Sequence, residues 1–131
     1  MSSNIYLEWR DEYLLGVTEL DHEHKDLFSR LNELHEELNR DNDKGHVEGC
    51  LGGIYARVSA HFALEENYMR ENNISGYEKH KKHHDMFLDE LREISDRLLN
   101  SGIDPKERDV LETTVRDWIL NHFTTTDREM I

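Results

Sequence analysis

The stretch HFALEENYMRENNISGYEKHKKHH, which runs from His61 to His84, contains two pairs of polar residues at helical spacing. His61 and Glu65 form an H-x-x-x-E pair, and His80 and His84 form an H-x-x-x-H pair beyond the polar segment ENNISG. Residues four apart in a helix project from the same face, about one turn apart. Two such pairs on neighbouring helices can direct three imidazoles and a carboxylate at one point, and these ligand types suit first-row transition metals.

Apolar residues recur every three or four positions on both sides of this stretch, which predicts four helices of roughly 20 residues each. Residues with the side chains that favour helix starts precede each periodic segment. These starts are Thr18 in a T-E-L-D sequence that resembles a capping box, Asp43 as an N-cap, Ser75 with Glu78 as a capping box, and Asp104 followed by Pro105.

Short connections between helices of this length imply that consecutive helices run antiparallel. We therefore predict an all-α fold, an antiparallel up-down-up-down four-helix bundle over residues 18–131. Residues 1–17 are predicted to form an N-terminal arm packed on the bundle, because they include several apolar side chains. These are Ile5, Leu7, Trp9, Tyr13, Leu14 and Leu15.

The composition excludes several classes of partner. The chain has 16 Lys and Arg against 29 Asp and Glu, a net charge of −13, which should repel nucleic acid and anionic lipid surfaces. No stretch approaches the roughly 20 apolar residues of a membrane span, and the start resembles no signal peptide. The single Cys50 excludes an internal disulfide. We expect a cytoplasmic protein with no nucleic-acid or membrane partner.

Every predicted helix places a polar metal-ligand type within its apolar face. One buried histidine is ordinarily a hydrogen-bonded core residue, but six such groups on four helices would need six separate partners, whereas one metal centre satisfies all of them. The six are His24, His61, Glu65, His80, His84 and His122. The other histidines, His22, His35, His46 and His83, lie off these faces and are expected at the surface, and Cys50 is expected to be an apolar filler.

Four motifs together resemble the hemerythrins, specifically the single-domain bacterial ones. They are D-x-x-H at Asp21–His24, H-F-x-x-E-E-x-x-M at His61–Met69, H-x-x-x-H at His80–His84, and W-I-x-N-H-x-x-x-x-D at Trp118–Asp127. The resemblance implies a centre of two non-haem iron ions with an oxo or hydroxo bridge. By the same resemblance, His80, His84 and His122 bind one iron, His24 and His61 bind the other, and Glu65 and Asp127 bridge both.

This ligand set leaves a coordination position open on the iron with two histidines, and the resemblance implies reversible dioxygen binding there, for storage, delivery or sensing. Nitrogen-rich ligation favours binding over catalysis, so we expect no enzyme. The alternative is a di-iron redox enzyme acting on O2, NO or peroxide. Phe62, Trp118 and Ile119 are expected to shield the open position. Asp127 follows His122 by five residues, about 140° away on an ideal helix, so its bridging requires a loosened last turn.

Overall fold

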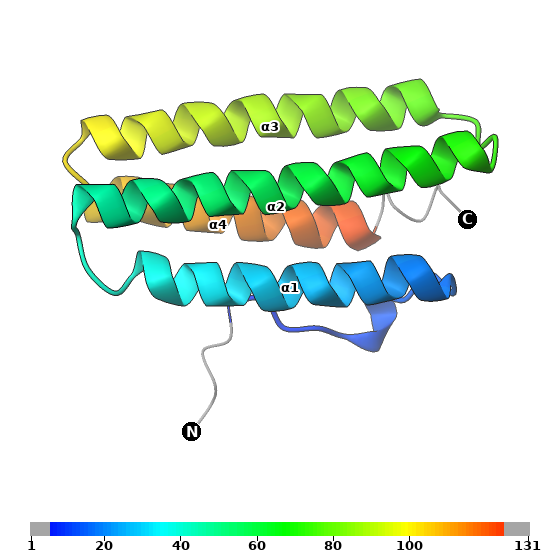
Figure 1. The fold of residues 1–131 in the computed structure, drawn as a ribbon, viewed down its shortest axis with the longest axis horizontal. Coiled ribbons are helices and arrows are strands. Elements are labelled where there is room, and N and C mark those ends of the chain that lie inside the picture. Colours follow the sequence, from blue (N-terminus) through cyan, green and yellow to red (C-terminus); the bar gives the residue numbers. More distant parts are fainter. Residues whose placement is uncertain (1–5, 125–131) are drawn as a thin grey trace.

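The chain forms four long helices joined by short connections, as seen in a computed structural model that describes residues 6–124 (Figure 1). The helices are α1 (Thr18–Leu38), α2 (Lys44–Glu71), α3 (Tyr77–Asn100) and α4 (Pro105–Thr124), and a short 3-10 helix, η1 (Asp11–Tyr13), precedes them. Regular structure in this range is entirely helical. The predicted all-α four-helix bundle is confirmed, while η1 was not predicted.

The alternating direction of the helices brings sequence-distant segments to one end of the bundle. In Figure 1 the start of α1, the end of α2, the start of α3 and the end of α4 all lie at the right-hand end. His24 lies early in α1, His61 and Glu65 late in α2, His80 and His84 early in α3, and His122 late in α4. The topology alone therefore gathers the predicted ligands at that end.

The predicted capping side chains act at two helix starts and do not act at the other two. Asp43 accepts a hydrogen bond from the His46 amide at 3.0 Å and Asp104 accepts one from Lys106 at 3.0 Å, so both are N-caps as predicted. α1 begins at Thr18 as predicted, but the capping box expected there is wrong, because Val17 is the N-cap and no side chain caps this end. The predicted capping box at Ser75 is wrong.

Gly76 is the N-cap residue of α3, and α3 begins at Tyr77. Gly76 has φ +89°, in the left-handed region that glycine enters without steric cost. No side chain caps this end. The left-handed backbone of Gly76, rather than a serine side chain, therefore marks the start of α3.

The interior of the bundle away from the ligand end is apolar. Buried residues of all four helices form one cluster, and a smaller cluster of Leu15, Leu20 and Met69 lies at the ligand end. Glycines in α2 do not break the helix, and only Gly53 approaches a neighbour closely, since a Cβ there would lie 3.1 Å from Leu34 Cδ2. The contact is with a side chain and not with a backbone.

The arm packs on the bundle over its described part. Leu7 is buried, and both of its backbone groups bind the Asn32 side chain, the amide at 2.8 Å and the carbonyl at 2.9 Å. Trp9 and Tyr13 contact the Phe28 ring. Ile5 lies outside the described residues.

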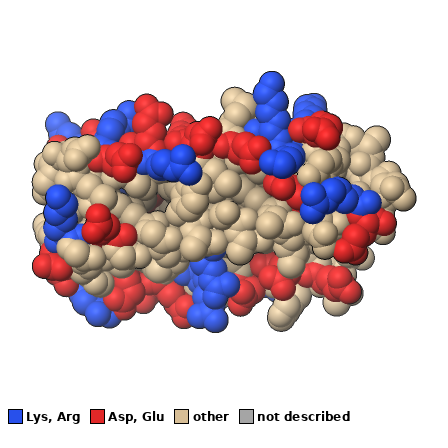
Figure 2. Space-filling view, turned by 45° about the horizontal axis from the view of Figure 1, so that its top comes forward, with Lys and Arg blue, Asp and Glu red and all other residues tan. Residues whose placement is uncertain are grey.

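Charged side chains point outward with both signs interspersed, as the face in Figure 2 shows. Within residues 6–124, none of the helices combines the length and the apolar character that a membrane crossing requires.

Two histidines predicted to be solvated are instead half-buried. His35 stacks on Tyr6 with ring centroids 4.3 Å apart, and the His46 ring lies 2.6 Å from the Glu37 carbonyl oxygen.

Candidate metal centre

The six inward-facing residues predicted as ligands lie together, and we call them the ligand cluster. The buried carboxylate of Glu65 in α2 is at its centre. Its side chain is fully buried, and five imidazoles from all four helices surround its two oxygens. The side chains converge because each lies on the apolar face of its helix and because the alternating helix directions bring these parts of the helices to one end of the bundle. The five rings are those of His24, His61, His80, His84 and His122.

The two oxygens of Glu65 face different groups of rings. Oε2 lies 2.7 Å from His24 Nε2 and 2.8 Å from His61 Nε2. Oε1 lies nearest the remaining three rings, at 3.1 Å from His84 Nε2 and 3.5 Å from both His80 Nε2 and His122 Nε2. The geometry thus divides the cluster into two groups, of two and three imidazoles, that share one carboxylate.

Electrostatics keep the central carboxylate ionised. Burial by itself would raise the pKa of Glu65, because an apolar surrounding disfavours the charged form. The charge of His61 and hydrogen bonds from the surrounding imidazoles outweigh this burial. The pKa of Glu65 therefore lies well below its ordinary value, and the group is available as an anionic ligand.

Aromatic side chains enclose the rings of the three-histidine group. The Phe62 ring stacks on His84 with centroids 3.9 Å apart and planes 2° from parallel. Trp118 stacks on His122 at 4.4 Å and 16°. Ile119 is fully buried. The three residues were expected to shield the open position beside the two-histidine group, and that expectation stays a prediction. Among the ligand rings, Phe62 and Trp118 lie closest to those of the three-histidine group, while Phe62 also lies 6.4 Å from the His61 ring.

The predicted inward and outward histidines can now be compared with their positions. His24 is buried while His22, two residues earlier, is exposed, which agrees with the apolar-face argument. His83 was expected at the surface but is half-buried and stacks on His122 with centroids 5.5 Å apart. Asp127 lies outside the described residues. Cys50 is buried, as expected of a small apolar filler.

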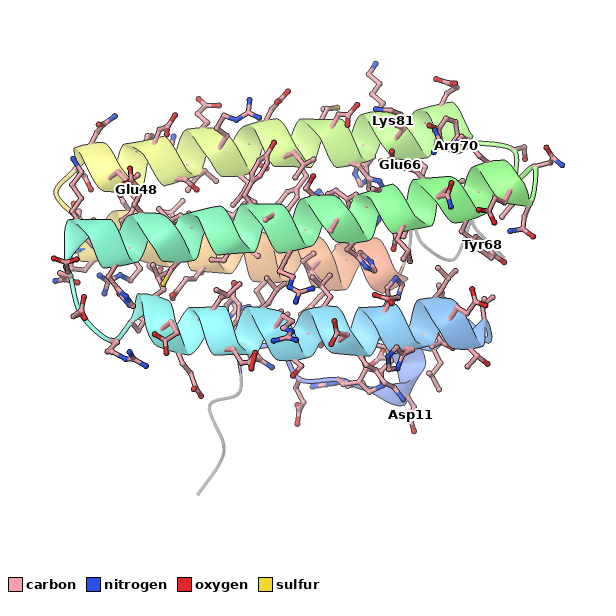
Figure 3. The ribbon with its side chains drawn as sticks, in the orientation of Figure 1. Asp11, Glu48, Glu66, Tyr68, Arg70 and Lys81 are labelled. Atoms are coloured by element: carbon pink, nitrogen blue, oxygen red, sulfur yellow. The ribbon has the colours of Figure 1, made fainter. Side chains whose placement is uncertain are left out.

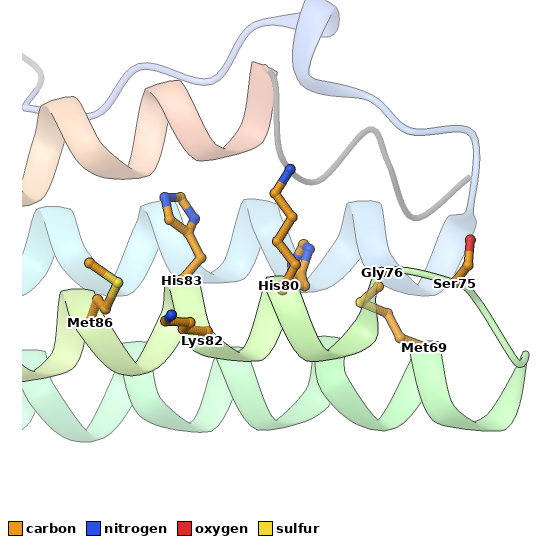
Figure 4. A pocket seen from close by; sticks show the side chains of 8 residues that line it. Met69, Ser75, Gly76, His80, Lys82, His83 and Met86 are labelled. Carbon is orange, nitrogen blue, oxygen red and sulfur yellow. The ribbon is translucent and has the colours of Figure 1, made fainter.

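A cavity of about 260 Å³ lies over the first turns of α3, where His80 and His83 form part of its wall (Figure 4). Lys79, Lys82 and Met86 of α3 and Met69 of α2 also line it. His80 is only 3% exposed. The cavity is therefore a place within residues 6–124 where the ligand cluster comes close to the surface.

Two further acidic residues make contacts at this end of the bundle that the sequence did not predict. Asp21 contacts the backbone before α1, and Glu66 contacts the His84 ring. The Asp21 carboxylate accepts hydrogen bonds from the backbone amides of Leu15 at 2.7 Å and Gly16 at 3.2 Å. The Glu66 carboxylate lies 2.9 Å from His84 Nδ1. Both residues lie within the quoted motifs, but the sequence gives no signal for the particular partner of each.

The residues present suit a pair of transition-metal ions. Neutral imidazoles and an ionised carboxylate are ligands for iron and its neighbours in the first row. The His84 and His122 Nε2 atoms lie 3.1 Å apart and both face Glu65, so these ring nitrogens converge within the bundle. Burying so many polar groups together costs free energy unless they share a partner, and a cation between them is such a partner.

Fold and site together define a four-helix-bundle protein with a buried cluster of histidines and a carboxylate that could hold metal ions. The sequence model of the hemerythrin family, described as the hemerythrin HHE cation-binding domain, matches residues 15–131, and the chain belongs to this family.

Named relatives extend along most of the chain. A bacteriohemerythrin of Clostridium acetobutylicum is 28% identical and covers 94% of this chain and 97% of its own length. A bacteriohemerythrin of Stenotrophomonas maltophilia is 27% identical, with coverage of 93% and 77%. Hemerythrin subunit 1 of Golfingia vulgaris is 29% identical, with coverage of 91% and 85%.

Proposed function

We propose that the chain binds dioxygen reversibly at a centre of two non-haem iron ions held around Glu65. The observation that carries the proposal is the convergence of five imidazoles on one buried carboxylate whose two oxygens face different groups of rings. Membership of the hemerythrin family supports iron and dioxygen as the ligands. The residues proposed to hold the metals are His24 and His61 for one ion, His80, His84 and His122 for the other, and Glu65 and Asp127 as bridges.

Two iron ions with an oxo or hydroxo bridge would supply the electrons and the open coordination position that dioxygen binding needs. The protein's own residues would fix the ions and exclude water. Glu65 stays ionised and so offsets part of the metal charge. Phe62 is almost completely buried beside the ligands, and an apolar wall of this kind limits the access of water to the site.

Storage, delivery or sensing of dioxygen is the role that this ligand set favours over catalysis. Five nitrogen ligands with two carboxylates differ from the carboxylate-rich sets of ferritin-like di-iron proteins, in which each of two helices supplies an E-x-x-H motif. The alternative function is that of a redox enzyme, which would turn over O2, NO or peroxide steadily.

An optical titration of purified protein with its iron counted tests the proposal. The protein is reduced without oxygen, exposed to O2, freed of O2 again, and taken through a second cycle. We expect two irons per chain and a visible absorption band that appears with O2 and disappears without it. A one-way change to the oxidised form would favour a redox enzyme, and a protein without iron would refute the proposal.

The histidines of α1 provide a matched pair of variants. His24 is fully buried in the cluster, while His22 is exposed on the same helix. His24→Ala is expected to lose iron and the oxygen-dependent band, whereas His22→Ala keeps both. Equal iron contents in the two variants would contradict the proposed ligand set.

A further inference from the structure

We propose that Glu66 is a positioning residue of the metal centre, which orients the His84 ring and holds its proton on Nδ1. The inference rests on the proposed function only in taking the cluster around Glu65 as the metal site. His84 Nδ1 lies 2.9 Å from Glu66 Oε2. An ionised carboxylate can only accept a hydrogen bond, so the Nδ1–H group of His84 is the donor.

The other edge of the His84 ring faces the cluster. Its Nε2 atom lies 3.1 Å from Glu65 Oε1 and 3.1 Å from His122 Nε2. A neutral imidazole carries one N–H group and one lone pair. With the proton on the Glu66 side, the lone pair of Nε2 points toward the other ligands. Glu66 therefore selects the tautomer in which His84 can bind a metal through Nε2.

The face of the same ring is held by a third side chain of α2. Phe62 stacks on His84 at 3.9 Å and 2°, and it precedes Glu66 by four residues, one helical turn. Phe62, Glu65 and Glu66 thus contact the face and both nitrogens of one ring. Because His84 is fully buried, this contact set fixes the orientation of its ring.

Glu66 lies between α2 and α3 (Figure 3), and its side chain is 14% exposed. A carboxylate that binds the second nitrogen of a histidine ligand orients the ring and strengthens its donation to the metal. Stronger donation stabilises the more oxidised metal ion. Glu66 is therefore expected to raise iron affinity and to lower the reduction potential of the iron that His84 binds.

The test compares iron-loaded full-length protein with three variants. Glu66→Ala removes the hydrogen bond and the charge, while Glu66→Gln keeps an oxygen acceptor and removes only the charge. Glu48→Gln is the matched control, since Glu48 is exposed on the same helix about 27 Å away by helical rise. It removes the same charge and touches none of the ligands named above.

Iron affinity is measured by competition with a chelator, and the midpoint potential by redox titration. We expect binding weaker by about 10- to 100-fold in Glu66→Ala, a smaller loss in Glu66→Gln, and no change in Glu48→Gln. The potential should rise in both Glu66 variants. A purely structural role would weaken binding in Glu66→Ala but leave the potential of a folded Glu66→Gln protein unchanged, which would overturn the inference.

The outcomes separate this inference from the proposed function. If wild-type protein binds iron but not O2 reversibly, the function fails while the effects on affinity and potential remain measurable. If wild-type protein binds O2 reversibly and both Glu66 variants keep wild-type affinity and potential, only the role of Glu66 fails. Thermal unfolding of each variant shows whether it is folded, and Glu66→Gln keeps the test decisive if Glu66→Ala is not.

Discussion

The carboxylate of Asp21 ties the arm to the start of α1, and its removal should be costly. Its Oδ1 atom accepts a buried hydrogen bond from the Leu15 amide at 2.7 Å, and a hydrogen bond to a charged group contributes about 1.5–3 kcal/mol. The bond to the Gly16 amide adds little, because Gly16 is exposed and water can replace it. A negative charge in the first helical turn contributes a further ~0.3–1 kcal/mol.

Asp21→Ala should therefore lower the free energy of unfolding by about 2–4 kcal/mol. For 131 residues the unfolding entropy is about 0.28 kcal/mol per kelvin, so the Tm should fall by about 7–14 °C. Asp21→Asn should lose less, because its amide oxygen still accepts from Leu15. Circular dichroism during heating, at fixed protein concentration and iron content, measures the shift.

Glu19→Ala is the control for this measurement. Glu19 also lies in the first turn of α1 and is exposed, so its removal costs only the interaction with the helix dipole. A Tm loss in Asp21→Ala no larger than in Glu19→Ala would refute the reasoning. Leu15 packs with Leu20 and Met69 at the ligand end, so Asp21→Ala should also release iron to a chelator faster than Glu19→Ala does.

Three further outcomes follow from the buried groups. Removing iron should lower the stability by about 4 kcal/mol when free iron had stood at roughly 1,000 times its dissociation constant; an unchanged Tm after chelation would contradict this. In iron-free protein, the lowered pKa of Glu65 means that its stabilisation is present above the ordinary carboxyl pKa of about 4.3 and is lost as the pH falls toward the lowered value. The free energy of unfolding of Glu65→Gln, measured with urea, should fall less on acidification than that of the wild-type protein. An equal fall would count against the lowered pKa of Glu65. Burial, followed by the charge of Glu37, raises the pKa of the Cys50 thiol, so iodoacetamide should alkylate it more slowly than free cysteine at pH 8; equal rates would rule this out.

The inward position of the proposed ligands could be predicted because helical periodicity fixes the face on which a residue lies. His24 falls in line with the apolar residues of α1 and His22 does not, and this difference alone distinguished the buried ring from the exposed one. The capping aspartates Asp43 and Asp104 were predictable for a similar reason, since each acts on an amide two or three residues away.

Features that depend on contacts between distant segments could not be predicted. Tyr6 donates a hydrogen bond to the carbonyl of Glu112, and His35 lies 3.1 Å from the Glu112 carboxylate. His35 is half-buried because the arm crosses it, and periodicity within α1 carries no information about the arm. At α3 the local capping signal of Ser75 competes with the left-handed conformation of Gly76, and only the folded chain decides between them.

The sequence H-F-x-x-E-E encodes two overlapping pairs with different tasks. His61 and Glu65 are four residues apart and both face the bundle interior. Phe62 and Glu66 have the same spacing but are displaced by one residue, about 100° around the helix. That displacement turns them toward α3, where they contact the His84 ring on its face and at Nδ1. One helix thus supplies the central carboxylate of the proposed centre and contacts a proposed ligand of its neighbour, and a shift of either glutamate by one residue would lose one of the two tasks.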